Sequence, residues 1–493
     1  MIYGFNSFGY AGSLVGVETE VKDGTPAYDI AGIADSYVSS TRELVKSAVA
    51  QSGFEIPQKN ILTTFSPLDL KKDDGGFAFP AALSLIAKSV ADVLVMGVLE
   101  TNGDIISCIK GTFSACQNAV NNGIKYAILP MGSKVPCGIK VCEVGSLKEA
   151  ADAITSLNIG DDRLFTERGP GRFSTENNIL FNDDIPELRP EFDGTENRSL
   201  KFAMTAAIAG GHHLIAYGKP RYTNLITVGL RLLLPKLSFN ESTVTSRIHS
   251  LAGIYEPDNY VTERPLRKPL PSITIEGMFG GGIRCKPGEI SLAHNGVLFL
   301  DEAEEFKTSV LQLLRVPLSA GNITLSRAGR STVFPSKFQL FMSSYQCPCG
   351  NFGSKEKICL CSKNAIETFR KKLAFPLNDR LAVRINTNND DVQCKDFTLE
   401  ELRKFISTAW KHQLGRQGKL NHYLSVDEAF GLRISDEAKS FFDEAAEDFS
   451  VGRKAEILKL ARTLCDISDG SDEIKEEHIE EAVKLNGKSP AEI

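Results

Sequence analysis

The chain has 493 residues, a formal net charge of −6, and 42% hydrophobic and 24% charged residues. This length predicts two to four domains, and the composition is that of an ordinary globular protein. The best candidate for a membrane span, Leu83–Leu99, is interrupted by Lys88 and Asp92, and a span needs roughly 18 apolar residues. The net charge predicts no general affinity for nucleic acid, so contact with DNA requires a local basic surface.

The start of the chain, MIYGFNSFGY, has neither a basic segment nor a continuous apolar segment. No signal peptide is therefore predicted, which favours the cytoplasm. The chain contains 11 cysteines, an odd number. In a chain of this length without an export signal, they indicate reduced thiols or metal ligands and argue against a disulfide framework.

The first predicted domain, residues 1–158, is an α/β unit. Apolar and polar residues alternate between Ser13 and Val21, which predicts a half-exposed strand. Asp35 is expected to cap a helix that follows. Apolar runs at Val93–Leu99 and Tyr126–Met131 predict buried strands separated by helices.

The rest of the chain predicts a linker and two further domains. Residues 159–197 are rich in Gly, Pro and charged residues and read as a linker or extended connection. Residues 198–395 hold three predicted core strands of a second α/β unit: Leu214–Tyr217, Val297–Leu300 and Phe338–Met342. Residues 396–493 are predicted to be all-α. One apolar helical face is marked by Ile457, Leu458, Ala461, Leu464 and Cys465.

The strongest local signal is GEISLAHNGVLFLDE, residues 288–302. A buried strand here delivers Asp301 and Glu302 to its carboxyl end, where ligands bind in open α/β sheets. In a phosphate-loop ATPase the first carboxylate holds Mg²⁺ and the second orients the attacking water. The alternative is a solvated acidic turn after a buried strand.

This segment, with ITLSRA (323–328), FPSKFQL (334–340), CPCG (347–350) and PLNDR (376–380), resembles the ATPase core of the ComM/YifB family. GVETEV, GTPAYDIAGIADS, SGFEIP and DDGGFAFPAAL upstream and ARTL (461–464) downstream extend the resemblance over nearly the whole chain. It implies an N-terminal domain with the fold of the Lon proteolytic domain, an AAA+ module with a magnesium-chelatase-type insertion, and a helical lid. It also implies a hexameric ring that uses ATP and Mg²⁺ and acts on DNA, as ComM does in branch migration during natural transformation.

The phosphate-binding loop departs from the family pattern Gly-Pro-Pro-Gly-Ser-Gly-Lys-Thr. The aligned residues are Gly218, Lys219, Pro220, Arg221, Tyr222, Thr223, Asn224 and Leu225. Asn224 stands at the position of the phosphate-binding lysine and Leu225 at that of the Mg²⁺-binding hydroxyl. Loss of the lysine removes a charge-assisted contact worth about 1.5–3 kcal/mol, so hydrolysis is expected to be crippled. Lys219 is either a displaced substitute or an exposed turn residue.

Other positions expected to face the nucleotide have also changed. Tyr345 stands where the family has a sensor Asn, and Glu456 where it has Arg, although Arg462 remains. Arg380 matches the Arg of the family's Asp-Arg pair, which implies an arginine finger for the neighbouring subunit. Its alternative role is a surface salt bridge with Asp379.

Four cysteines cluster as Cys347-Pro-Cys349 and Cys359-Leu-Cys361. Two close pairs of thiolates can surround one Zn²⁺ tetrahedrally. The Cys-x-Cys spacing is tighter than the commoner Cys-x-x-Cys, so reduced buried thiols and a redox pair remain alternatives.

The insertion, roughly residues 263–286, carries Arg264, Arg267, Lys268, Arg284 and Lys286 around three successive glycines. Such a loop suits sequence-independent contacts to phosphates of DNA in a pore, and its alternative is a solvated loop. Peptidase activity of the N-terminal domain is not expected, because DDGGF (73–77) and FSACQ (113–117) lack a serine and lysine pair.

Two functions follow from these features. The first is a ring or scaffold protein, as a homo-oligomer or in a mixed ring with a paralogue, that binds DNA but is impaired in ATP hydrolysis. The second is an active ATP-dependent DNA motor with a non-standard phosphate loop. A metal-chelatase subunit for tetrapyrroles is disfavoured by the Lon-like domain and the CPCG cluster.

Overall fold

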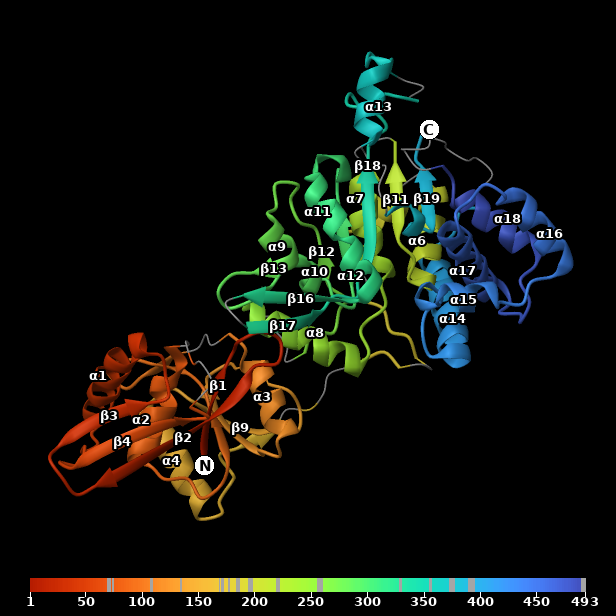
Figure 1. Cartoon of the computed structure of the whole chain (residues 1–493). Helices are drawn as coiled ribbons and strands as arrows, with labels where there is room; N and C mark the ends of the chain where they lie inside the picture. Colours follow the sequence, from red (N-terminus) through yellow and green to blue (C-terminus); the bar gives the residue numbers. More distant parts are fainter. Residues whose placement is uncertain are drawn as a thin grey trace.

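The computed structural model describes the chain except for residues 69–71, 73–74, 107–109, 134, 168, 170–172, 176–177, 183–186, 194–197, 219–221, 255–259, 328–329, 354–356, 372–376, 389–394 and 489–493. Within the described residues, two sheets each carry helices on both faces, and a group of helices follows them in the chain (Figure 1). No helix of the described part is at once long and apolar enough to cross a membrane.

The N-terminal sheet has the strand order β10-β9-β8-β5-β1-β2-β4-β3. Its strands are β1 (Ile2–Asn6), β2 (Ser13–Lys22), β3 (Ala27–Ala31), β4 (Asn60–Ser66), β5 (Val93–Val95), β8 (Tyr126–Pro130), β9 (Lys140–Val144) and β10 (Thr166–Glu167). β2 confirms the strand predicted from residue 13. The run predicted as one strand at Val93–Leu99 divides into β5 and β6 (Val98–Leu99), and β6 pairs with β7 (Ile105–Ile106) in a separate hairpin.

Helices cover both faces of this sheet because successive side chains of a strand point to opposite sides. Val93 and Val95 pack with α1 (Asp35–Gln51), α2 (Ala78–Ile86) and α4 (Leu147–Asn158), whereas Leu94 packs with α3 (Thr112–Asn121). The prediction that Asp35 caps α1 was wrong. The cap is Ala34, and Asp35 is the first residue of the helix, where a negative charge is favourable.

The second sheet is parallel and has the order β12-β15-β18-β11-β19. Its strands are β12 (Leu266–Arg267), β15 (Val297–Leu300), β18 (Gln339–Ser344), β11 (Leu214–Tyr217) and β19 (Val383–Asn386). β11 and β15 have the predicted bounds. One face packs on α6 (Arg198–Gly210), α7 (Thr223–Leu233) and α17 (Val451–Ser468), and the other on the segment from α9 (Ile275–Phe279) to α12 (Arg315–Ala320).

The C-terminal region is helical, as predicted, and lies beside β19 and α6 (Figure 1). It contains α14 (Leu399–Gln417), α15 (Val426–Phe430), α16 (Asp436–Ala445), α17 and α18 (Glu476–Leu485). The five apolar residues predicted to mark one face of α17 are all buried, but burial extends beyond that face. Every residue from Ala455 to Ile467 is buried, because the neighbouring helices and the sheet surround this helix.

The segment predicted as a linker packs on the second unit, where Phe192 of α5 (Arg189–Asp193) is fully buried.

Two elements of the second unit, α8 (Phe239–Ala252) and a hairpin, contact the N-terminal unit. Arg247 of α8 donates to the backbone carbonyls of Tyr10 and Ala11 at 3.1 and 2.6 Å and lies over the Tyr10 ring. The hairpin of β16 (Asn322–Arg327) and β17 (Arg330–Pro335) also reaches the N-terminal unit, since Thr332 Oγ1 accepts from Tyr10 N at 2.9 Å.

Candidate nucleotide and metal sites

The carboxyl edge of the parallel sheet gathers several of the predicted site residues. Gly218 follows β11, Asp301 and Glu302 follow β15, and Tyr345 follows β18. Gly218 has a φ of +129°, and a Cβ there would lie 2.8 Å from Thr387 Oγ1, so glycine is required for this close approach. Because these strands are parallel neighbours, the topology brings their carboxyl ends, and these residues, to one edge of the sheet.

Three side chains occupy the oxygens of Asp301. The hydroxyls of Ser343 and Thr223 donate to Oδ1 at 2.5 and 2.9 Å, and Lys268 Nζ lies 2.9 Å from Oδ2. Burial opposes ionisation of Asp301, but these hydrogen bonds and the ammonium group outweigh it and lower its pKa. The carboxylate is therefore ionised and already carries a cation where a divalent ion would bind.

Glu302 is also held by internal partners. Tyr345 donates its hydroxyl to Glu302 Oε1 at 3.1 Å, and Ser343 Oγ accepts from Glu302 N at 3.0 Å. Burial and the neighbouring Glu302 carboxylate raise the pKa of Tyr345 to about 12, so the phenol stays protonated as the donor. The backbone of Glu302 is in the left-handed region, with φ +53°. Tyr345, which replaces the family's Asn, thus engages the carboxylate expected to orient water.

The loop after β11 differs from its expected register. Thr223, the first residue of α7, supplies the hydroxyl beside Asp301, whereas Leu225, aligned with the family's hydroxyl position, is buried in the core. Asn224 is exposed. Lys219 and Pro220, both predicted to touch the nucleotide, lie outside the described residues. The helical spacing of α7 explains the difference, since Leu225 and Ile226 must face inward.

The hollow beside these residues is small. It is lined by Tyr222, Thr223, Glu302, Ser343 and Tyr345, among others, and has a volume of about 20 Å³. That is close to the room needed for one water molecule. This hollow by itself is too small for a nucleotide triphosphate, and residues 219–221, which follow β11 at the same edge, lie outside the described residues.

Two other predicted site residues lie away from this edge. Arg380, in the 3₁₀ turn η4 (Asn378–Arg380), precedes β19 and so lies at the amino edge of the sheet. Arg462 is buried in α17, with Nη2 2.7 Å from Asp466. Arg462 is thus committed to an internal ion pair, and the structure does not bring it to Asp301, contrary to the sequence interpretation.

The cations of the insertion are largely paired. Arg264 donates to both oxygens of Glu241 at 3.0 and 2.8 Å, and Arg267 pairs with Glu289 at 2.6 Å. Lys268 pairs with Asp301. The prediction that all five cations surround a pore loop is therefore not met by these three, each of which lies against a carboxylate.

Arg284 and Lys286 of the insertion are exposed and gather with Lys110 of the N-terminal unit around a small hollow. The positive charge of Lys110, with burial and Arg284, lowers the pKa of Lys286. This basic cluster, Lys110, Arg284 and Lys286, concentrates like charges at the junction of the two units.

The four predicted metal-binding cysteines come together. Cys347 Sγ lies 3.4 Å from that of Cys349 and 3.7 Å from that of Cys359, and Cys349 lies 3.6 Å from Cys359. All four sulfurs, including that of Cys361, lie within 4.8 Å of one another. Zinc bonds of about 2.3 Å place tetrahedral sulfurs about 3.8 Å apart, so the arrangement fits one zinc ion.

The cysteine cluster lies between β18 and α13 (Lys363–Lys371), and α13 stands beyond the carboxyl ends of β18 and β11 (Figure 1). Phe352 N donates to Cys347 Sγ at 3.3 Å. A hydrogen bond from the backbone of Asn351 lowers the pKa of Cys349 to about 6, and hydrogen bonding by Cys349 raises that of Cys361 to about 12. One thiolate is thus favoured even before a metal binds.

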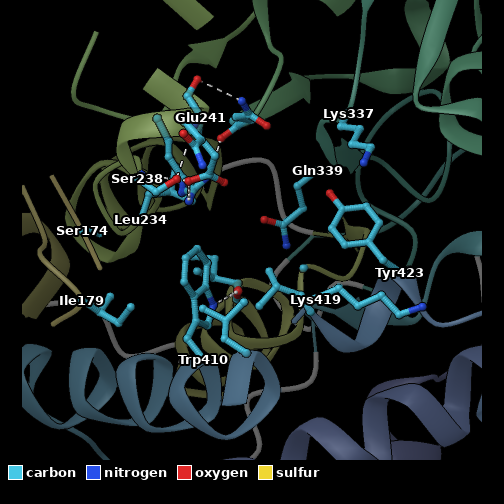
Figure 2. A pocket seen from close by; sticks show the side chains of 18 of the residues that line it. Ser174, Ile179, Leu234, Ser238, Glu241, Lys337, Gln339, Trp410, Lys419 and Tyr423 are labelled. Carbon is cyan, nitrogen blue, oxygen red and sulfur yellow. Dashed lines mark hydrogen bonds and ion pairs between the residues drawn. The ribbon is translucent and has the colours of Figure 1, made fainter. Parts of the chain in front are cut away.

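A larger cavity, which the sequence interpretation missed, opens at the amino edge of the parallel sheet. It has a volume of about 590 Å³, and Gly211, Gly296 and Phe338, which precede β11, β15 and β18, lie in its wall. Figure 2 shows Trp410 and Tyr423 on one side and Glu241 on the other. Trp410 is the one tryptophan of the sequence, and Arg264 lies 4.9 Å from its ring.

The chain is similar to known proteins over nearly its full length. Residues 191–394 match the family described as magnesium chelatase, subunit ChlI, residues 17–133 match subunit ChlI of Mg-chelatase, and residues 398–486 match the ChlI C-terminal family. The uncharacterized protein YifB of Escherichia coli is 29% identical over 95% of this chain and 93% of its own. The competence protein ComM of Haemophilus influenzae is 28% identical over 98% and 96%. The chain therefore belongs to the ComM/YifB family of magnesium-chelatase-like proteins.

Proposed function

We propose that this chain is a ring or scaffold protein of DNA processing in natural transformation that does not turn over ATP. Its assembly is a homo-oligomer, with a hexameric ring expected, or a mixed ring with a catalytically competent paralogue, in the cytoplasm. Residues 1–158 form a Lon-like platform, 159–197 a connection, 198–395 an AAA+ core and 396–493 its helical lid. The similarity to a competence protein supports the role in transformation.

The observation that carries this proposal is the state of Asp301. Lys268 Nζ lies 2.9 Å from one of its oxygens, and two hydroxyls donate to the other. A divalent ion would have to displace the ammonium group, and the adjacent hollow of about 20 Å³ has no room for a triphosphate. The loop also lacks the family's lysine, since Asn224 stands in its place.

The test is binding and hydrolysis of ATP by the purified full chain. We expect no Mg²⁺-dependent binding of a fluorescent ATP analogue and no release of phosphate above that of the Asp301→Asn variant. Tight ATP binding, with hydrolysis that Asp301→Asn abolishes, would overturn the scaffold proposal. It would establish an active motor with a non-standard phosphate loop. The variant serves as the matched control because a contaminating ATPase would be indifferent to it.

The DNA partner is supported by the basic cluster. Like charges repel, so three exposed cations held together favour a polyanion, and neutralised phosphates release counterions. Arg284 and Lys286 also lie in the insertion, whose glycines and cations suit contact with phosphates.

For this partner, we expect fluorescently labelled forked DNA to bind with an affinity that falls as salt rises. Replacing Arg284 and Lys286 with alanine should reduce the slope of log K against log[salt] by about 2 if each contacts a phosphate. The control is the double variant Lys46→Ala with Lys484→Ala, on α1 and α18, where the two lysine side chains are 42% and 61% exposed. Equal slopes for both double variants would show that the basic cluster does not contact the DNA.

We also propose that Cys347, Cys349, Cys359 and Cys361 hold a structural zinc ion. The sulfur separations fit a tetrahedral ion, and four protein ligands leave no position for a substrate. Zinc analysis of the purified chain should find one ion that the Cys349→Ser with Cys361→Ser variant lacks. An unchanged zinc content would leave the cysteines as reduced thiols or a redox pair.

A further inference from the structure

A second group of metal-ligating side chains lies at the amino edge of the parallel sheet, far along the chain from the cysteines. His212 is in the turn before β11, His422 is in the 3₁₀ turn η5 (Asn421–Tyr423), and Glu456 is in α17. One ligand atom from each lies within 4.8 Å of the others. His212 and Glu456 are buried, with 0% and 8% of their surfaces exposed. We refer to these three residues as the His212 cluster.

Each member of the His212 cluster has a buried polar atom without a hydrogen-bond partner. These atoms are His212 Nδ1, His422 Nδ1 and Glu456 Oε2. His422 Nδ1 and Glu456 Oε2 are 3.6 Å apart, which is too long for a hydrogen bond. Leaving a buried polar atom unsatisfied costs about 1–3 kcal/mol, so three in one place indicate a missing partner.

The hydrogen bonds around His212 fix its tautomer. Thr463 Oγ1 lies 2.8 Å from His212 Nε2, and the one proton of this hydroxyl is donated to Lys459 O at 3.0 Å. The hydroxyl oxygen must therefore accept the proton of Nε2, which leaves Nδ1 with a bare lone pair. In metal-binding histidines, the ring nitrogen that does not bind the metal usually donates a hydrogen bond, as Nε2 does here.

His213 can be excluded as a ligand by the same reasoning. Leu340 N donates to His213 Nδ1 at 3.1 Å, so the proton of its neutral ring is on Nε2. Its ring lies 4.3 Å from that of His422, and Nε2 has no hydrogen-bond partner either. It is suited to donate a proton to a further ligand of a bound ion.

From these atoms we infer that His212, His422 and Glu456 bind a divalent transition metal ion, with zinc as the ion expected. Two imidazoles and a carboxylate are ligands that zinc prefers. Bonds of about 2.0–2.2 Å span the 3.6 Å between His422 Nδ1 and Glu456 Oε2 at a near-tetrahedral angle. For the His212 nitrogen, tetrahedral binding requires an approach to about 3.4 Å from the other two ligand atoms.

One cation opposes this binding and provides a sharper test. Lys459 Nζ lies 2.7 Å from Glu456 Oε1, the other oxygen of the same carboxylate. It leaves Oε2 free, but its charge weakens the attraction for a second cation. Removal of the ammonium group should therefore strengthen metal binding, whereas removal of the carboxylate charge should abolish it.

The position of the His212 cluster gives a bound ion a structural consequence. His212 is attached to the sheet, whereas His422 and Glu456 belong to the C-terminal helical region. An ion held by all three would cross-link the sheet to these helices and restrict their relative movement. This inference concerns a different edge of the sheet from Asp301 and does not depend on the absence of ATP turnover.

The test is the zinc content and zinc affinity of the full chain and of the isosteric variant Glu456→Gln. We expect Glu456→Gln to contain one zinc ion fewer per chain and to lose at least about 100-fold in affinity at that site. With Co²⁺ in place of zinc, the difference spectrum should show ligand-field bands without the thiolate charge-transfer bands that the cysteine cluster produces. Glu437→Gln, an exposed carboxylate of the same helical region, is the matched control.

Equal zinc content and equal Co²⁺ spectra for the wild type and folded Glu456→Gln would overturn the inference. Should Glu456→Gln fail to fold, Lys459→Met decides the question, because it keeps all three ligands. Tighter zinc binding by Lys459→Met supports the site, and unchanged or weaker binding contradicts it.

Discussion

The two edges of the parallel sheet differ in how their polar groups are satisfied. At the carboxyl edge, Asp301 has three partners and Glu302 is held by Tyr345. At the amino edge, His212, His422 and Glu456 each have a buried ligand atom without a hydrogen-bond partner. A cavity of about 590 Å³, whose wall includes Gly211 and Tyr423, also opens at this edge. The described carboxylates at the edge where open α/β sheets bind ligands thus have internal partners, whereas the opposite edge has buried polar atoms without hydrogen-bond partners.

This difference teaches that acidic residues that match a family motif do not by themselves mark a functional nucleotide site. Asp301 and Glu302 lie where the family pattern puts them. Each, however, has an internal partner in the place of its expected ligand, which is Mg²⁺ for Asp301 and water for Glu302. Whether a carboxylate serves chemistry or packing depends on the side chains opposite it, here Lys268 and Tyr345.

The largest effect is expected from the buried ion network behind the amino edge. Asp466 is fully buried and accepts from Arg416 at 2.8 Å and from Arg462 at 2.7 Å. Asp466→Ala leaves the buried Arg462 without its carboxylate and should lower the free energy of unfolding by about 3–5 kcal/mol. Urea denaturation measures this change, and the exposed Asp443→Ala should stay within about 0.5 kcal/mol of wild type. A small effect of Asp466→Ala would mean that water replaces the lost oxygens.

A somewhat smaller effect on the free energy of unfolding is expected from acid, and it differs between the two edges. Burial, with the charge of Lys337, lowers the pKa of His294 at the amino edge to about 4, from 6.5 in the unfolded chain. Between these pH values the unfolded state binds the extra proton, so stability is complete above pH 6.5 and is lost as pH falls towards 4. The loss from this residue is about 3 kcal/mol. The lowered pKa of Asp301 stabilises the fold at pH values above the ordinary aspartate range, and this contribution is lost only as pH falls through and below that range.

The variant His294→Asn isolates this contribution, because an Asn oxygen can accept from Lys337 N as His294 Nδ1 does at 3.0 Å. Unfolding free energies measured from pH 7 to 4 should show a slope reduced by one proton, about 1.4 kcal/mol per pH unit. Identical slopes would show that His294 titrates normally.

The smallest effect is expected at the carboxyl edge. Lys268 is 40% exposed and Asp301 is 22% exposed, so solvent screens their ion pair. Lys268→Ala should lower the free energy of unfolding by no more than about 1 kcal/mol, since two hydroxyls still donate to Asp301. Thermal unfolding at low and high salt provides the measurement, and the difference should shrink at high salt. A loss of several kcal/mol would mean that this edge is as tightly coupled as the amino edge.

Sequence patterns predicted the local elements of this protein well where one physical rule dominates. Continuous apolar runs located β11 and β15 with their bounds, and the close cysteine pairs located a cluster of four thiols that could hold a metal ion. The periodicity of apolar residues was not enough where neighbouring elements determine burial. On α17, for example, residues on all sides of the helix are buried, and not only those on one face.

The sequence alone determined the family, the alternation of elements and the loss of the loop lysine, because each is a property of residue type and order. Only the tertiary structure decided the partners of the charges. Lys268 and Asp301 are 33 positions apart and His212 and Glu456 are 244 apart in the numbering, and no periodicity relates them. Such contacts depend on how strands and helices pack, which is why the internal partners at the carboxyl edge and the His212 cluster emerged only from the fold.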